Sequence, residues 1–399
     1  MSLKCPNCGG QVVYDPKQAK IVCKFCEGKT ATEDFSKLAG REDYDKENVQ
    51  QESKTEPAVD EFMETNIYHC KSCGADLMLT GTEASTFCSY CGSPTIVFDR
   101  VSKELRPKWI IPFKITEAQA LECIRKRFKK GSYIPKKIKE LTVDKVHAIY
   151  MPYWLFDTCL RRKMIVDAYT DNNVTFKYTR DASCRYEKVS LDASMRLNNE
   201  MSRRLEPFQM DDLVEFDVAY LSGFYADKYD VEKEALINTN LDRCRAYLDD
   251  AILDSCPRVN KVTMGKIRNY EKKPISEEYQ IENIDYALLP AYFVNLKYDT
   301  GKQLVMVNGQ TGKVVGNLPF EKERFIQKFI INSLIACPIL MFVSYLGVFA
   351  LPIFMIPAAI TAIMVYNGIH AYKNYKQGLY RLSATNMTSY ANNREDITW

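Results

Sequence analysis

The sequence predicts a multidomain protein with two small zinc ribbons of four cysteines each, a central α+β region with antiparallel strands, and a C-terminal transmembrane α-helical hairpin. Three observations predict this fold class. Four C-x-x-C pairs form two quartets of equal spacing, strand-like aromatic runs alternate with helical patterns in the middle, and a long uncharged apolar segment lies near the end. With 399 residues, of which 46% are apolar and 26% charged, the chain can bury a sizeable core.

Eight of the 14 cysteines form the two quartets. Both read C-x2-C-x14-C-x2-C, and adding 65 to each number of the first quartet gives the second. Two such knuckles can hold four thiolates about 2.3 Å from one tetrahedral Zn²⁺. The predicted ligands are Cys5, Cys8, Cys23 and Cys26 for one zinc ion, and Cys70, Cys73, Cys88 and Cys91 for a second.

Structural disulfides, thioredoxin-like redox pairs and an iron–sulfur cluster are the alternatives to zinc. Met1 to Lys4 runs straight into Cys5, so no signal peptide indicates an oxidising compartment. No βαβ pattern surrounds the pairs, as a redox motif would require. Because four thiolates fill the coordination sphere, both zinc ions are expected to be structural, and His69 is expected to be a surface residue rather than a ligand.

The quartets also set the expected domain boundaries. Between the ribbons, residues 30–66 hold eleven acidic and four basic side chains and few large apolar ones. This composition is typical of a flexible linker, so the ribbons are expected to move independently. The expected units are ribbon 1 at 1–30, the linker at 31–66, ribbon 2 at 67–100, the α+β region at 101–320, two transmembrane helices at 325–372 and a cytoplasmic tail at 373–399.

The α+β region begins with a basic stretch. Residues 101–163 hold sixteen basic and six acidic side chains. Within it, Thr116 and Gln119 predict a capping box for a helix that ends near Lys130. The predicted apolar side of this helix carries Ala118, Leu121, Ile124, Arg125 and Phe128. Its basic end could contact nucleic acid, anionic lipid or an acidic partner, or form a solvated face.

Two aromatic runs, at 148–156 and 287–294, predict strands, and each precedes a second strand-like run. They suggest two similar β units, with a helix between them near 231–253. The stretch from Asn308 to Gly316 looks like a phosphate-binding loop but lacks the required spacing, so a hairpin turn is predicted there.

The apolar segment from Phe329 to Tyr372 has 44 residues and no Lys, Arg, Asp or Glu. A single helix needs about 20 apolar residues to cross a ~30 Å hydrocarbon core, so two helices are predicted, with a buried hairpin as the alternative. Lysine and arginine flank both ends, and the positive-inside rule then places both termini in the cytoplasm. The thiolates of the ribbons also require a reducing compartment.

Three further motifs follow the ribbons and precede the apolar segment: Ile111-Pro112-Phe113-Lys114, Met151-Pro152-Tyr153-Trp154 and Asn308-Gly309-Gln310-Thr311-Gly312-Lys313. In this order they resemble a bacterial family of membrane-anchored proteins with transcription factor IIB-type zinc ribbons, known from Gram-positive species. The resemblance implies a multi-pass protein of the bacterial cytoplasmic membrane. It also implies phage-shock protein A and a flotillin-like protein as companions.

The leading functional prediction is a non-enzymatic, zinc-binding integral membrane protein that serves as a cytoplasm-facing scaffold or recruitment platform in envelope stress. Its expected partners are membrane lipid and cytoplasmic or membrane proteins. The alternative is a membrane-tethered nucleic-acid-binding protein related to transcription or replication. Charge favours the first, because residues 68–92 hold one lysine against Asp76 and Glu83. With three histidines and no nucleophile or nucleotide motif, the chain is expected to have no catalytic or nucleotide-binding residues.

Overall fold

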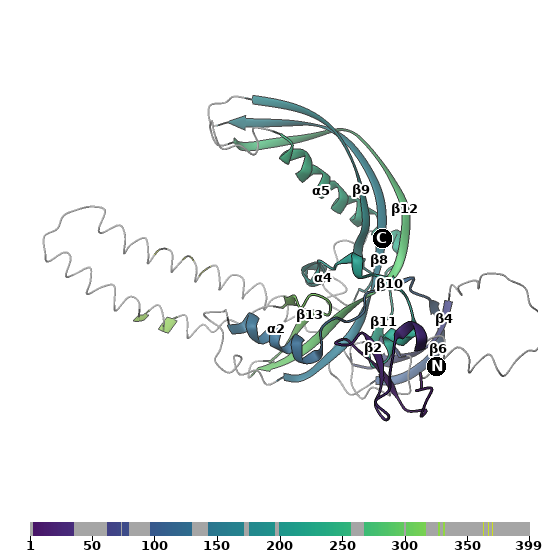
Figure 1. Ribbon diagram of the computed structural model, residues 1–399. Helices are drawn as coiled ribbons and strands as arrows, with labels where there is room; N and C mark the ends of the chain where they lie inside the picture. Colours follow the sequence, from purple (N-terminus) through teal and green to yellow (C-terminus); the bar gives the residue numbers. More distant parts are fainter. Residues whose placement is uncertain are drawn as a thin grey trace, which may run out of the picture.

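Figure 1 shows the computed structural model of the chain. The structure describes residues 3–35, 62–72, 74–79, 96–129, 143–170, 175–195, 199–256, 267–298 and 301–316, together with the isolated positions 326, 327, 330, 331, 362, 366 and 369. The described strands form one sheet of three strands near the N-terminus and one of eleven strands.

The small sheet consists of β1 (Val12–Asp15), β2 (Lys20–Cys23) and β3 (Lys29–Thr30), all antiparallel. Its strands alternate buried and more exposed residues, as expected for a sheet with one covered face. The buried side chains of Val12, Tyr14 and Ile21 form a small core with Phe35.

Two very long antiparallel strands, β8 (Val143–Thr170) and β12 (Ile267–Tyr298), run through the large sheet. The two aromatic runs that the sequence suggests as similar units lie opposite each other here, and Met151 faces Leu289 at their centre. Both runs make the same contact with a neighbouring strand: the carbonyl of Pro152 accepts from the N–H of Ala193, and that of Pro290 accepts from the N–H of Gly309. The two aromatic runs therefore make equivalent backbone contacts on their outer sides.

The other strands add to this pair. The order of the hydrogen-bonded strands is β10 (Val214–Glu215), β7 (Trp109–Ile110), β12, β8, β11 (Tyr225–Asp227), β5 (Asp76–Leu79), β4 (Phe62–Cys70) and β6 (Ile96–Leu105). Three more strands pair off this path: β9 (Thr175–Asp192) with β8, β13 (Gly301–Asn308) with β12, and β14 (Val314–Val315) with β13. Because β5 pairs with β11, the strands of the second ribbon belong to the large sheet. The expectation that this ribbon moves independently is wrong.

The motif at 111–114 and the loop at 308–313 meet beside the central strands. The N–H groups of Lys114 and Ile115 both donate to the carbonyl of Gly309, at 3.0 and 3.1 Å. A Cβ atom at Gly309 would lie 2.6 Å from the Phe113 ring, so only glycine fits there. The predicted hairpin turn is confirmed: it joins β13 to β14, and Gly312 takes a φ of 74°.

The predicted capping box is also confirmed, at the start of α2 (Glu117–Lys129). The Thr116 N–H donates to the Gln119 side chain at 2.8 Å, and the Gln119 N–H donates back to the Thr116 hydroxyl at 3.4 Å. The buried stripe, however, is formed by Ala120, Ile124 and Phe128, while Ala118 is exposed. The predicted apolar side was therefore wrong at its first residue, since the fully buried positions follow a four-residue spacing from Ala120.

Beyond the central region, β8, β9 and β12 extend as a curved three-stranded arm, with α5 (Ile237–Asp254) on its concave side (Figure 1). Leu160 and Met164 of β8 pack on Cys244 and Leu248 of α5. Next to Asp157, both β9 and β12 shift register against β8. Extra residues in both neighbouring strands at one level bend a sheet. Short helices lie in the connections, among them α4 (Asn199–Leu205), η1 (Met210–Asp212), η2 (Val218–Leu221) and η3 (Lys233–Leu236).

The predicted transmembrane hairpin needs correction. In the described part of the chain, the structure contains no helix that combines the length and the apolar character needed to cross a membrane. The segment 325–372 falls outside the described residues except at its isolated positions. The prediction depended on the length, the apolar composition and the missing charge of the run, and such a run can be buried against protein as well as against lipid. The same finding corrects three further predictions: the membrane part of the fold class, the integral-membrane function, and the multi-pass location with cytoplasmic termini.

A buried carboxylate joins three strands where the arm leaves the sheet. Asp285 of β12 accepts from Lys108 Nζ at 3.0 Å, from Trp109 Nε1 at 2.8 Å and from Lys188 Nζ at 3.0 Å. Burial raises the pKa of this carboxyl, but the hydrogen bonds from Trp109, Lys108 and Lys188 outweigh burial and lower the pKa to about 2. The charged form of Asp285 is therefore bound more tightly in the folded state.

Asp285→Asn should lower the free energy of unfolding by about 2 kcal/mol at neutral pH. Because the folded pKa lies below that of the unfolded chain, near 3.9, the contribution is complete above about pH 4 and is lost as the pH falls towards 2. Urea unfolding should therefore show about half the difference at pH ~3. The exposed carboxylate of Asp250 gives the control variant Asp250→Asn, with little effect. An equal loss at both pH values would contradict this origin.

Candidate metal centre

The first quartet is built from two knuckles with the same backbone pattern. In the first, the Cys5 N–H donates to the Gly10 carbonyl and the Gly9 N–H donates to the Cys5 carbonyl, both at 2.8 Å. In the second, Cys23 and Glu27 make the equivalent bonds, at 3.0 and 3.1 Å. Gly9 and Glu27 both have positive φ, as the tight turn requires. Each turn therefore points its two thiols to one side.

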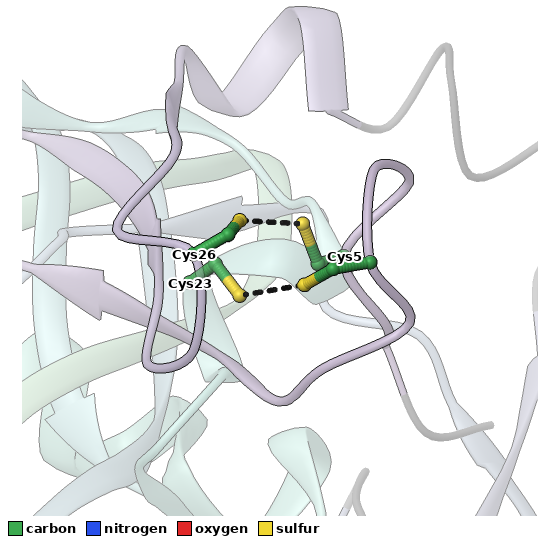
Figure 2. A group of neighbouring side chains, drawn as sticks. Cys5, Cys23 and Cys26 are labelled. Atoms are coloured by element: carbon green, nitrogen blue, oxygen red, sulfur yellow. Dashed lines mark hydrogen bonds between the residues drawn. The ribbon is translucent and has the colours of Figure 1, made fainter.

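The four sulfur atoms converge between the knuckles, and Figure 2 shows those of Cys5, Cys23 and Cys26 turned toward the centre. Cys5 Sγ lies 3.7 Å from Cys26 Sγ, and Cys8 Sγ lies 3.5 Å from Cys23 Sγ. All four lie within 4.8 Å of one another. A metal ion with four sulfur ligands at about 2.3 Å would separate neighbouring sulfurs by about 3.8 Å. The quartet thus has the dimensions of a tetrahedral metal site, as the sequence predicts.

The pKa values of two thiols in the quartet, Cys23 and Cys8, are shifted in opposite directions. Backbone N–H groups of Cys26 and Phe25 lower the pKa of Cys23 to about 6. At Cys8 the Gly10 N–H lowers the pKa, but hydrogen bonds with Cys23 and Cys26 raise it more, to about 12. Four crowded sulfurs cannot all ionise without a compensating cation, which a bound metal ion would supply. The donor set therefore fits a metal ion that prefers thiolate ligands.

The second quartet is described in part. Cys70 is fully buried, and its knuckle repeats that of Cys5: the Cys70 N–H donates to the Ala75 carbonyl and the Gly74 N–H donates to the Cys70 carbonyl, both at 2.8 Å. Gly74 has a φ of 75°. Cys73, Cys88 and Cys91 lie outside the described residues. His69 is half exposed, and its Nδ1 lies 2.8 Å from Asp76 Oδ1.

The first ribbon also contacts the large-sheet unit, which the sequence analysis did not predict. The Tyr14 N–H donates to the Ser222 carbonyl at 3.0 Å. Its ring lies 5.3 Å from that of Tyr220 and 6.4 Å from that of Phe224. Burial, with Tyr220 and Asp15 nearby, raises the pKa of Tyr14 to about 12. An aromatic residue in a strand is too common a signal to reveal this contact from sequence, and the expectation that ribbon 1 moves freely is wrong.

Tyr14→Ala should detach the first ribbon from the segment 218–224 while leaving its metal content unchanged. The ring packs against Tyr220 and Phe224 of that segment but lies outside the quartet, so amide hydrogen exchange in the segment should rise at least about tenfold. Hydrogen-exchange mass spectrometry and elemental analysis provide the two measurements. Tyr247→Ala, at an exposed tyrosine of α5, is the matched control. Loss of metal, or unchanged exchange at 218–224, would show that Tyr14 has another role.

Comparison with known proteins gives one relative. No protein-family profile matches the chain. No solved structure matches it either. The uncharacterized protein YdjG of Bacillus subtilis (strain 168) is 30% identical over 340 residues, covering 81% of this chain and 91% of that protein. The shared region extends over most of both proteins, so the chain belongs to the same family as the uncharacterized protein YdjG.

Proposed function

We propose that the protein is a structural zinc protein, in which the zinc ion of the first quartet holds its ribbon in shape against the large-sheet unit. The observation that carries the proposal is the convergence of the four sulfurs of Cys5, Cys8, Cys23 and Cys26 within 4.8 Å. An iron–sulfur cluster binds its cysteines through several different irons and spreads their sulfurs further apart. A single ion with four thiolates, for which Zn²⁺ is the usual occupant, agrees better with the distances.

A second zinc ion is proposed for Cys70, Cys73, Cys88 and Cys91. Its support is the knuckle at Cys70, which repeats the knuckle at Cys5 in both hydrogen bonds and in its positive-φ glycine. Because β4 and β5 flank this knuckle and β5 pairs with β11, a metal ion here would stabilise the end of the large sheet.

Both ions are proposed to act in folding rather than in catalysis. Four cysteine ligands leave no coordination position for water or substrate. In the first quartet, Cys5 and Cys23 are also buried at 6% and 2% exposure. The proposal therefore includes no enzymatic activity. The partners named in the sequence analysis remain predictions. Phage-shock protein A and a flotillin-like protein are supported only by the order of motifs, and nucleic acid only by the charge pattern.

The purified full chain should contain two zinc ions by elemental analysis. Cys23→Ser and Cys88→Ser should each leave one ion, because each removes one ligand from a different quartet, and three ligands hold the ion far less tightly. Cys159→Ser, at an isolated cysteine outside both quartets, should leave two. Iron in place of zinc, or loss of both ions from either single variant, would contradict the proposal of two separate zinc sites.

A further inference from the structure

The first quartet is divided into a buried half and an exposed half. Cys5 and Cys23, the first cysteine of each knuckle, are buried. Cys8 and Cys26, the second cysteine of each knuckle, are exposed to solvent. Each exposed sulfur lies close to the buried sulfur of the opposite knuckle: Cys8 is 3.5 Å from Cys23, and Cys26 is 3.7 Å from Cys5 (Figure 2). A reagent in solution can therefore reach half of the ligand set while the ribbon stays folded.

The exposure of these two thiols sets them apart. Of the ten cysteines in the described part of the chain, Cys8 and Cys26 are the two exposed ones. Cys244 and Cys256 are buried, and Cys159 is partly covered. The reactivity of a cysteine towards oxidants follows its thiolate character and its exposure. Because a bound metal ion keeps its ligands in the thiolate form at neutral pH, oxidants should react at the first quartet before the isolated cysteines.

The buried half of the quartet belongs to the contact between the first ribbon and the large-sheet unit. Cys5 and Cys23 form one small core with Tyr14 and with Ala219 of η2, and Tyr220 packs against this core. A zinc ion bound by the quartet would fix the positions of both buried sulfurs and thereby the packing around them. Loss of the ion would loosen the ribbon at the place where it meets the segment 218–224.

We propose that the first quartet is a peroxide-sensitive modification site. Disulfide formation between Cys8 and Cys23, or between Cys26 and Cys5, expels the zinc ion and releases the ribbon from the segment 218–224. This inference rests on the proposed function, since it requires zinc in the first quartet. Zn²⁺ itself does not change its oxidation state, so the electrons come from the sulfur atoms of its ligands.

Hydrogen peroxide, as the oxidant, accepts both electrons. The Cys8 thiolate attacks one peroxide oxygen, the O–O bond breaks, and hydroxide leaves, so that Cys8 becomes a sulfenic acid. The Cys23 thiolate, 3.5 Å away, attacks the Cys8 sulfur and displaces a second hydroxide. Two thiolates, one peroxide and two protons thus give one disulfide and two water molecules. The zinc ion keeps only two of its sulfur ligands, which bind it far less tightly, and dissociates.

The test adds hydrogen peroxide to the zinc-loaded full chain and follows the released zinc with a chromogenic chelator. Mass spectrometry of peptides should find Cys8 linked to Cys23, or Cys26 linked to Cys5. Amide hydrogen exchange at 218–224 should rise at least about tenfold. A thiol reductant together with added zinc should reverse all three changes.

The variant that combines Cys8→His with Cys26→His removes both exposed thiolates and keeps four ligands, because histidine is an ordinary zinc ligand. It should bind two zinc ions and release the ion of the first quartet at least about tenfold more slowly than the wild type. Cys159→Ser, which removes a partly covered thiol outside the quartets, is the matched control and should release zinc at the wild-type rate.

A wild-type chain that contains two zinc ions and retains both in peroxide would overturn the inference. Equally fast zinc release from the histidine variant would also overturn it, because the reaction would then lie at another cysteine. If the histidine variant fails to bind zinc, the disulfides of the wild type decide, and cross-links that leave out Cys8 and Cys26 contradict the inference. A chain without zinc in the first quartet before peroxide is added would instead contradict the proposed function.

Discussion

The antiparallel pairing of β8 with β12 is the constraint on which the rest of the structure depends. Four further strands, β7, β9, β11 and β13, form hydrogen bonds directly with one of these two. At the centre, Pro152 and Pro290 lack an N–H, yet their carbonyls accept from the residues just beyond β9 and β13. A slip of one residue between β8 and β12 would turn the buried aromatic side chains of the shifted strand to the opposite face.

The first ribbon forms a sheet of its own that contacts the large-sheet unit, whereas strands of the second ribbon belong to the large sheet itself. Ribbon 1 packs Tyr14 edge-on against Tyr220 of η2, and the strands around Cys70 continue the large sheet through β5 and β11. Under the proposal of two zinc ions, metal binding and sheet assembly are coupled, because an ion that orders a knuckle also orders the strands attached to it. Such coupling would let small cysteine motifs stabilise a protein whose hydrophobic core lies in the large sheet.

Local features could be predicted from the sequence, and features that depend on distant contacts could not. The first quartet, the capping box at Thr116 and the hairpin at Asn308 each depend on a few neighbouring residues. The contact of Tyr14 with Tyr220 and the β-bulge of β6 against β4, at Asp99, depend on segments far apart in the chain. The transmembrane hairpin was wrong because apolar composition indicates burial without identifying what surrounds the segment.

Native-state hydrogen exchange of the full, metal-loaded chain tests the central role of β8 and β12 most directly. If the pair supports the whole sheet, its central amides, at 149–155 and 287–293, should exchange only through global unfolding and be the slowest in the chain. Amides of β9 and β6 should open at lower free energy, since among the described strands these two pair on one side. Central amides of β8 and β12 that exchange as fast as those of the edge strands would contradict this account.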